Sequence, residues 1–208
     1  ALGRPAALLR RAEGLLDRLI VRLAHPVRGF EEASPARLPL RSNPHMHLLE
    51  ALLAWVSFGV DGSFRERAAD IVALAGECLI DPETGSIGEY YDAGWRPVAG
   101  SDGHIREPGH QFEWAFLLGE AETWLGLPAG DRPARLRAFG EAHGLASTGA
   151  AVFSVTDRGA VLDGSARLWA QTERLRTSLV FADLDAAESA LAVLNGFLKT
   201  DIPGLWLD

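Results

Sequence analysis

Helical periodicity extends over most of the sequence, and two kinds of helical segment alternate along it. Residues 43–58 and 108–125 are apolar nearly all round, which predicts helices that are buried on every side. Asn43 is a favourable N-cap with Pro44 as first helical residue, and Ser63 is a favourable cap for a later helix. The remaining helices are amphipathic or mixed, and they are predicted at 4–24, at 63–80, at about 131–143, from about Ser165, and at 183–199.

Two of the buried helices carry the same polar pair at the same depth. His47 and Glu50 recur 63 residues later as His110 and Glu113, and Glu173 follows another 60 residues on, with alanine in the His position. A period near 60, with one buried and one amphipathic helix in each unit, is typical of stacked helical hairpins. The predicted fold is therefore an all-α toroid, in which inner helices form a ring and their His and Glu side chains converge at one end of a central cavity.

Two short β-hairpins are predicted in the connections between helices. Residues 86–98 would turn around Asp92–Gly94, and residues 151–162 would turn at Asp157–Gly159. We expect one domain over 1–208, with about three and a half helical hairpins, whereas a closed ring of six would need roughly 360–380 residues on this period. Because an open arc exposes an apolar edge, we expect self-association into a homo-oligomer or low stability.

The charge balance and the cysteine count exclude several classes of protein. A formal net charge of −8 argues against nucleic acid as the main partner, because phosphate binding needs a basic surface. The single cysteine, Cys78, excludes an intrachain disulfide framework and suits the reducing cytoplasm. No apolar run reaches the ~18–20 residues of a membrane span, so no membrane partner is expected.

The spacing of the polar pairs predicts acid–base chemistry. Residues i and i+3 share one helix face, so Glu113 is expected to reach His110, and Glu50 to reach His47. A carboxylate fixes the tautomer of an imidazole and stabilises its protonated form, whereas the positive end of the helix starting at Pro108 opposes protonation. These opposed influences predict a His110 pKa near neutrality, which suits a base that removes a proton α to a carbonyl through an enediolate.

Three other interpretations of the same residues stay open. Buried His–Glu pairs can be purely structural hydrogen-bonded pairs. A metal site could use His45, His47, His110 and the glutamates, although His45 and His47 lie about 200° apart around a helix and cannot both face one ion. A carboxylate-pair glycosidase would leave the histidines unexplained. The aromatic side chains near these positions suit the apolar faces of a sugar ring.

Three motifs together resemble the N-acylglucosamine 2-epimerase family. They are "RSNPHMHLLEA" (41–51), "EPGHQFEWAFLL" (107–118) and "RLWAQTERLR" (167–176), and the resemblance covers residues 41–208. It is strongest for the branch of mannose and sulfoquinovose isomerases, whose bacterial members are often labelled mannose-6-phosphate isomerase-like. The resemblance implies an (α/α)6 barrel and an isomerase of open-chain sugars that uses neither a cofactor nor a metal.

The resemblance also implies roles for individual residues. His110 matches one of two catalytic acid/base histidines and Glu113 its partner, while His47 matches a histidine that contacts substrate oxygens. The resemblance also implies that the substrate pocket is lined or supported by Asn43, Glu50, Trp114, Trp169, Gln171 and Glu173. Removal of the C2 proton followed by reprotonation at C1 would give a ketose, and reprotonation at C2 would give the epimer.

The sequence departs from the family pattern at both ends. The family's second catalytic histidine lies beyond the point that corresponds to "GLWLD", and its first helices, with a substrate-binding arginine, are missing too. A truncated chain would be inactive alone, and a rival hypothesis is a non-catalytic sugar-binding or interaction protein. An unphosphorylated sugar such as mannose is expected, although an anion could be held by Arg41, Arg96, Arg106, Arg167, Arg174 and Arg176.

Overall fold

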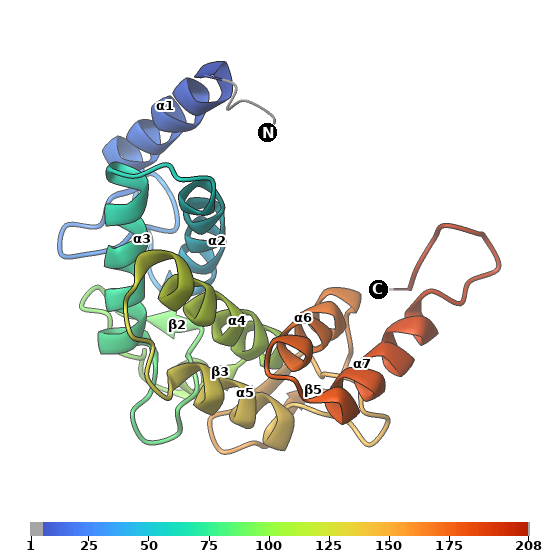
Figure 1. The fold of residues 1–208 in the computed structure, drawn as a ribbon. Coiled ribbons are helices and arrows are strands. Elements are labelled where there is room, and N and C mark those ends of the chain that lie inside the picture. Colours follow the sequence, from blue (N-terminus) through green and yellow to red (C-terminus); the bar gives the residue numbers. More distant parts are fainter. Residues whose placement is uncertain (1–5, 208) are drawn as a thin grey trace.

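The computed structural model describes residues 6–207, which form an arc of helices that is open on one side (Figure 1). The helices of this part of the chain are α1 (Ala6–Leu23), α2 (Asn43–Ser57), α3 (Ser63–Leu74), α4 (Pro108–Leu125), α5 (Arg132–His143), α6 (Leu168–Val180) and α7 (Leu184–Phe197). Each lies where the helical periodicity predicted it, although the first two residues of the predicted segment 4–24 fall outside the described residues. A single π-helical turn, Ala75–Leu79, extends α3.

The helices are arranged as consecutive antiparallel pairs. Helices α2 and α3, α4 and α5, and α6 and α7 pack against each other, and α4 also packs against both α2 and α6. Helices α2, α4 and α6 therefore form the inner row, and α3, α5 and α7 form the outer row (Figure 1). The predicted helical toroid is confirmed as an arc of hairpins.

Burial differs between the two rows as the composition predicted. Helix α4 buries Phe112, Trp114 and Leu117 on different sides, whereas α5 buries one face through Leu136 and Phe139. The two helices approach closely because Gly140 has no side chain: a Cβ there would lie 2.7 Å from the ring of Phe112. Close contact of backbone and ring replaces water with apolar atoms along the whole hairpin.

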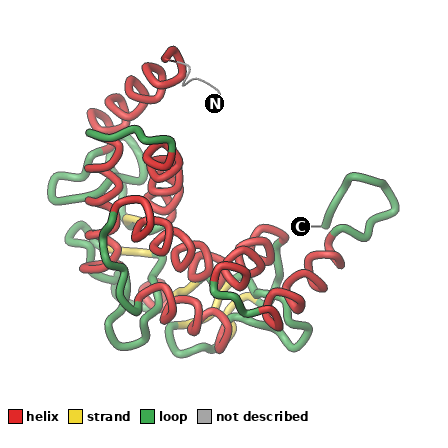
Figure 2. The backbone as a smooth tube through the Cα atoms, viewed as in Figure 1, coloured by secondary structure: helices red, strands yellow, loops and turns green. Residues whose placement is uncertain are grey.

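The strands lie in the connections between helices (Figure 2). They are β1 (Leu40–Arg41), β2 (Tyr90–Tyr91), β3 (Ile105–Arg106), β4 (Ser154–Thr156) and β5 (Val161–Asp163). The second predicted hairpin is confirmed, because β4 and β5 pair antiparallel. The first is confirmed only as a tight turn, in which Asp92 N–H donates to Arg96 O at 2.8 Å.

The strands also join connections that are distant in sequence, which the sequence did not predict. Strand β1 pairs with β2, and β3 pairs with β4, both antiparallel. Each small sheet therefore ties the segment before one inner helix to the segment before the next. The two small sheets therefore link the connections that precede α2, α4 and α6.

A pair of buried glutamines shows the repeat at atomic level. Gln111 accepts from Ile87 N–H at 2.8 Å and donates to Ile87 O at 3.0 Å. Gln171, 60 residues later, accepts from Ala151 N–H at 2.8 Å and donates to Ala151 O at 2.9 Å. Both amides are fully buried and clamp the connection that precedes their own helix. The period near 60 is therefore structural.

Two smaller predictions need correction or qualification. Helix α2 begins at Asn43, but Ser42 occupies the N-cap position, and α3 likewise begins at Ser63 after Gly62. Asn43 is thereby free of a capping role and lies at the cavity described below. Among the described residues, no helix is both long and apolar enough to cross a membrane.

Candidate active site

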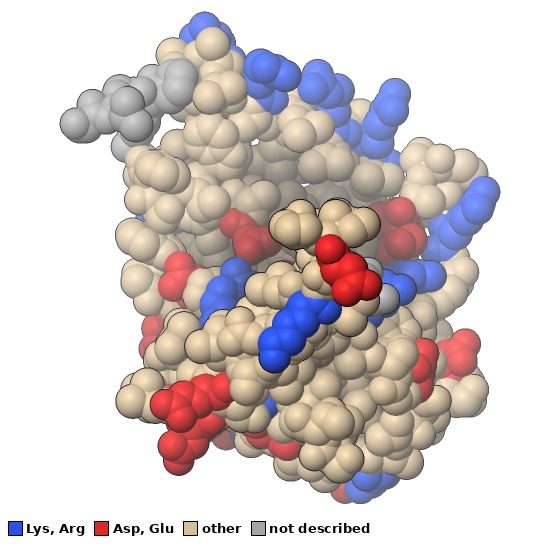
Figure 3. Space-filling model, turned by 90° about the vertical axis from the view of Figure 1, so that its right-hand side faces the viewer, with Lys and Arg blue, Asp and Glu red and all other residues tan. Residues whose placement is uncertain are grey.

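A cavity of about 530 Å³ opens at the N-terminal ends of the three inner helices. The view from the right-hand side of Figure 1 shows a hollow with both acidic and basic side chains at its walls (Figure 3). Of the residues expected there, those that line the cavity are Asn43, His47, Glu50, His110, Glu113, Trp169 and Glu173. Two further lining residues, Glu107 and Phe153, were not predicted, and Arg167, which was considered only for anion binding, lines the cavity too.

His110 is held by a carboxylate that the sequence did not single out. Its Nδ1 donates to Oε2 of Glu89 at 2.9 Å, and both side chains are about 95% buried. The expected partner was Glu113, which instead lies beside His47, with Oε1 at 3.7 Å from Nδ1. The pairing predicted from i,i+3 spacing was wrong, because the connection before α4 brings Glu89 closer than any residue of the helix does.

Glu89 is itself fixed by groups from two inner helices. Its Oε2 also accepts from the hydroxyl of Ser42 at 3.4 Å, and its Oε1 accepts from the backbone N–H of Glu107 at 3.2 Å. These donors stand at the starts of α2 and α4, where backbone N–H groups favour a negative charge. With Nδ1 of His110 engaged, Nε2 is the ring nitrogen available to a ligand.

The surrounding carboxylates control the protonation of His110. Burial lowers the pKa of this imidazole, but the charge and hydrogen bond of Glu89, with the charges of Glu107 and Glu113, outweigh it and raise the pKa to about 9. The prediction of a His110 pKa near neutrality is therefore wrong, because the carboxylates raise the pKa more than burial lowers it. Burial also raises the pKa of Glu107, against the opposing charge of His110.

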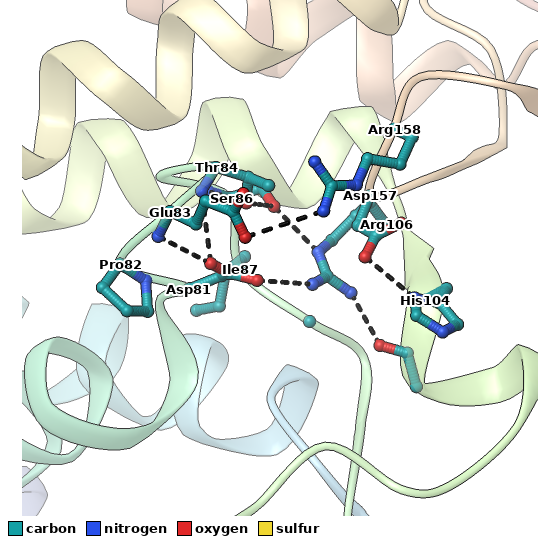
Figure 4. Close-up of polar contacts among 12 residues, drawn as sticks. Asp81, Pro82, Glu83, Thr84, Ser86, Ile87, His104, Arg106, Asp157 and Arg158 are labelled. Carbon is teal, nitrogen blue, oxygen red and sulfur yellow. Dashed lines mark hydrogen bonds and ion pairs between the residues drawn. The ribbon is translucent and has the colours of Figure 1, made fainter.

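A buried arginine anchors the connection that carries Glu89 (Figure 4). The Arg106 guanidinium donates from Nε to the Ser86 hydroxyl at 2.8 Å and from NH1 to Gly103 O at 3.0 Å, and its NH2 lies 3.8 Å from Asp81 Oδ2. A second contact links this connection to the one before α6, because Nδ1 of His104 lies 2.8 Å from Oδ2 of Asp157. These contacts hold both flanks of Glu89 and leave it little freedom to move away from His110.

The second histidine lies in a more open group. The His47 side chain is 61% exposed, and its partner Glu113 is nearly buried. Glu50, the partner expected for His47, instead pairs with Arg176 NH1 at 3.3 Å. The other terminal nitrogen of Arg176 forms a close ion pair with Glu173. The three repeat-related glutamates therefore meet at one cavity, as the spacing predicted.

Burial and neighbouring carboxylates raise the proton affinity of Glu113 and Glu173. Burial raises the pKa of Glu113 to about 7, with additional repulsion from Glu173 and Glu50, against the opposing charges of His110 and Arg176. Burial also raises the pKa of Glu173, and the charge and hydrogen bond of Arg176 oppose it. Glu113 is thus a carboxyl group that can exchange a proton near neutral pH.

An aromatic wall stands beside His110. The rings of His110 and Trp169 have centroids 5.2 Å apart, and the Arg167 guanidinium lies over the Phe153 ring at 5.3 Å. Gly109 makes the first contact possible, because a Cβ at that position would lie 2.4 Å from Trp169. Such a wall offers an apolar surface next to an acid–base group, which is the combination a sugar ring needs.

Two predicted site residues do not line the cavity. Trp114 is fully buried in the main hydrophobic core, because it follows Glu113 by one position and therefore points about 100° away from it around α4. Gln171 is fully buried against the Ala151 backbone. Gln171 supports the site by holding the connection that bears Phe153.

Two groups of the described residues place possible metal ligands within 4.8 Å of one another: His47, Glu50 and Glu113, and Glu89, Glu107 and His110. His45, considered as a ligand from sequence, points away from both. Its Nδ1 donates to Arg41 O at 3.1 Å and its Nε2 accepts from Phe30 N–H at 2.9 Å. Burial lowers the pKa of His45 to about 4, which makes it a neutral structural residue.

The missed residues share a location outside the inner helices. Glu89 lies in a loop beside β2, Glu107 immediately precedes α4, and Phe153 precedes β4. One signal for Glu89 is present in the sequence, because a single carboxylate stands between the apolar Ile87 and the aromatic Tyr90 and Tyr91. A carboxylate in a segment expected to be buried needs a partner.

Comparison with known proteins agrees with this geometry. The model of the N-acylglucosamine 2-epimerase (GlcNAc 2-epimerase) family matches residues 3–208. A curated protein of Rhizobium meliloti (strain 1021), named mannose-6-phosphate isomerase, is 40% identical over 99% of this chain and 57% of its own length. The chain thus spans little more than half of that relative.

Solved structures show the same fold at low identity. A sugar epimerase from a ruminal bacterium gives a TM-score of 0.78 at 16% identity, over 97% of this chain and 57% of its own. A D-mannose isomerase gives a TM-score of 0.74 at 16% identity, over 93% and 56%. A family match along almost the full chain, together with the 40% identical relative, places this protein in the N-acylglucosamine 2-epimerase family.

Proposed function

We propose that the protein carrying this chain is a sugar isomerase that converts an open-chain aldose of the mannose type into its ketose. The observation that carries the proposal is the His110–Glu89 pair, a buried imidazole held at 2.9 Å with one ring nitrogen left for a ligand. Family membership and the relatives named mannose-6-phosphate isomerase and D-mannose isomerase support the reaction class. An N-acylglucosamine 2-epimerase or mannose-6-phosphate isomerase activity is the alternative.

The proposed reaction moves two protons. Nε2 of neutral His110 removes the proton from C2, and the electron pair of that bond forms the C1=C2 bond of an enediolate with its negative charge on O1. The imidazolium exchanges its proton with solvent and then protonates C1, and the O2 proton passes to O1 as the C2 carbonyl forms. Glu113, as a carboxylate beside His47, serves the transfer between the oxygens.

A single acid–base group on one face of the enediolate favours isomerisation to the ketose over epimerisation at C2. One imidazole on one face can carry a proton from C2 to the neighbouring C1 of a planar enediol. Inversion at C2 needs, in addition, a proton donor on the opposite face of the enediolate. We therefore assign epimerisation as the alternative and ketose formation as the main reaction.

The charge of the cavity supports a neutral sugar. Four lining residues are glutamates, and Arg167 is the arginine among the described lining residues. Two of the other arginines considered for anion binding are engaged elsewhere: Arg174 makes two bonds of 2.9 Å to Glu141, and Arg106 is held in the connection described above. A phosphate would meet repulsion from carboxylates at short range, so unphosphorylated mannose is the preferred substrate over mannose 6-phosphate.

We further propose a single-domain unit that acts on a small sugar in the cytoplasm, does not bind nucleic acid, and self-associates. The half-buried lone thiol of Cys78 supports a reducing compartment. Exposed apolar side chains at the end of the arc, among them Leu191, Ile202 and Trp206, support self-association.

Hydrogen exchange tests the activity directly. The natural-length protein, incubated with mannose in deuterated water, should place deuterium at C2 of recovered mannose and at C1 of newly formed ketose, both read by proton NMR. Mannose 6-phosphate should be converted at least ten-fold more slowly. Binding of mannose without exchange at C2 would favour the rival sugar-binding function, and preference for the phosphate would overturn the choice of substrate.

A further inference from the structure

Arg176 stands where the repeat has apolar residues. It lies one helical turn after Glu173, and the residues one turn after Glu50 and Glu113 are Leu53 and Phe116. Leu53 is buried and Phe116 packs against the main core. The third inner helix therefore places a charged side chain directly beneath the layer of glutamates, at a position where its two counterparts are hydrophobic.

The guanidinium uses this position to reach two helices at once. It stacks on the Phe116 ring, with Cζ 4.0 Å from the ring centroid. From there NH1 reaches Glu50 Oε1 of α2 at 3.3 Å, and NH2 forms the close ion pair with Glu173 of its own helix. The pair with Glu50 joins residues 126 positions apart, so Arg176 links the first repeat to the third beneath the cavity.

We propose that Arg176 is a positioning residue that ties down two of the three equivalent glutamates, Glu50 and Glu173, and thereby makes Glu113 the carboxylate that serves the sugar. The inference rests on the proposed isomerase function. Three equivalent carboxylates around one cavity would otherwise repel one another and compete for the same hydroxyl groups. A planar guanidinium holds two carboxylates in fixed directions, which a flexible ammonium does not do.

The electrostatics of the group agree with this division of roles. Burial raises the pKa of Glu113, the charges of Glu173 and Glu50 raise it further, and Arg176 lowers it. Because Arg176 is bonded to Glu50 and Glu173, its influence on Glu113 acts through space. Loss of Arg176 therefore raises the pKa of Glu113 above about 7, and loss of the Glu50 and Glu173 charges lowers it.

The test follows log kcat/KM for mannose against pH in the natural-length protein. In the unmodified enzyme kcat/KM should rise with pH, with a lower break near pH 7, where Glu113 ionises, and an upper break near pH 9, above which His110 is the neutral base and kcat/KM is level. Arg176→Leu, which installs the side chain found at Leu53, should move the lower break to higher pH and reduce kcat/KM at pH 7 about 10-fold. Arg176→Lys should restore the break only in part.

A second variant keeps the test independent of whether Arg176→Leu folds. In Glu50→Gln/Glu173→Gln the arginine stays and the repelling charges are gone, so the lower break should move to lower pH. The matched control is Arg67→Leu, which removes an ion pair with the same i,i+3 spacing, to Asp70, on the outer helix α3. This control should leave both breaks in place.

The outcomes separate the inference from the function on which it rests. A lower break that stays at the unmodified pH in folded Arg176→Leu, or in the double glutamine variant, overturns the role of Arg176 while the isomerase activity stands. An unmodified protein that forms no ketose overturns the proposed function instead. Carboxyl-carbon NMR of the substrate-free protein reports the same Glu113 titration without turnover, and an unchanged Glu113 titration in Arg176→Leu would also overturn the inference.

Discussion

The two histidines of the cavity are equivalent in the repeat and opposite in their surroundings. The His110 side chain is 5% exposed, and its Nδ1 donates to Glu89 at 2.9 Å. The His47 side chain is 61% exposed, and its Nδ1 lies 3.7 Å from the nearest carboxylate oxygen of Glu113. Identical positions on neighbouring inner helices therefore hold a buried imidazole bonded to a carboxylate and an exposed imidazole that lies farther from its carboxylate.

The connections between helices cause the difference. The connection before α4, residues 80–107, contributes Glu89 and Glu107 to His110 and is fastened by Arg106. The connection before α2, residues 24–42, contributes Ser42 to Glu89 and leaves His47 to the solvent side of the cavity. The helical repeat sets where a polar side chain lies, and the preceding connection sets its chemistry.

The largest expected effect is on turnover, and it differs between the two histidines. Because general acid–base groups contribute ~10²–10⁴-fold, His110→Asn should lower kcat for ketose formation by that factor. His47→Asn removes an exposed side chain and should lower kcat by less than about 10-fold while raising KM. Steady-state kinetics of both variants in the natural-length protein measures the contrast.

Thermal melting of the same two variants is the control, since both should remain folded. Equal losses of kcat in the two folded variants would mean that the buried and the exposed histidine contribute equally to turnover. Near-normal kcat in folded His110→Asn would show that the His110–Glu89 pair is structural.

A smaller effect separates the connection before α4 from the connection before α6. Gln111→Leu and Gln171→Leu each leave buried backbone groups without a partner, so each should lower the free energy of unfolding by about 1–3 kcal/mol. Gln111→Leu should also lower kcat several-fold, because its amide holds Ile87, two residues before Glu89. Gln171→Leu should act on kcat less, because the connection it holds brings Phe153 to the cavity wall and no partner to His110. Urea denaturation and kinetics measure the two quantities, with the exposed Glu122→Gln as control. A loss of activity confined to Gln171→Leu would reverse the assignment of the two connections.

The inner helices and their residues were predictable because their signals are local and periodic. The bounds of α4 agree with the predicted 108–125, and the glutamates at 50, 113 and 173 meet as the spacing indicated. The helical wheel also explains why Trp114, one residue after Glu113, points into the core. The helix bounds and the side-chain directions depend on residues within a few turns of one another, and the meeting of the glutamates follows from the repeat of about 60 residues.

The partner of His110 was not predictable by the same reasoning. Glu89 lies 21 residues before His110, in a segment with no helical period, and it reaches the imidazole only because β2 pairs with β1 and Arg106 fixes the following loop. The ion pair of Arg176 with Glu50 spans 126 residues and likewise depends on the curvature of the arc, which brings α2 and α6 to the same cavity. Contacts between loops that are distant in the chain leave no periodic pattern in a single sequence, so they could not be predicted from it.

The most direct measurement of the central claim is the pH dependence of kcat/KM in Glu89→Gln. The glutamine keeps the size of Glu89 and an acceptor for the Nδ1 proton but removes the charge. In the unmodified enzyme, burial lowers the pKa of His110 and the carboxylates raise it to about 9, so activity that needs the neutral imidazole should rise with pH up to that value. Without the Glu89 charge the opposing effect of burial remains, and the break should move well below pH 9. A break that stays near pH 9 in Glu89→Gln would contradict the assignment of His110 and Glu89 as the acid–base pair.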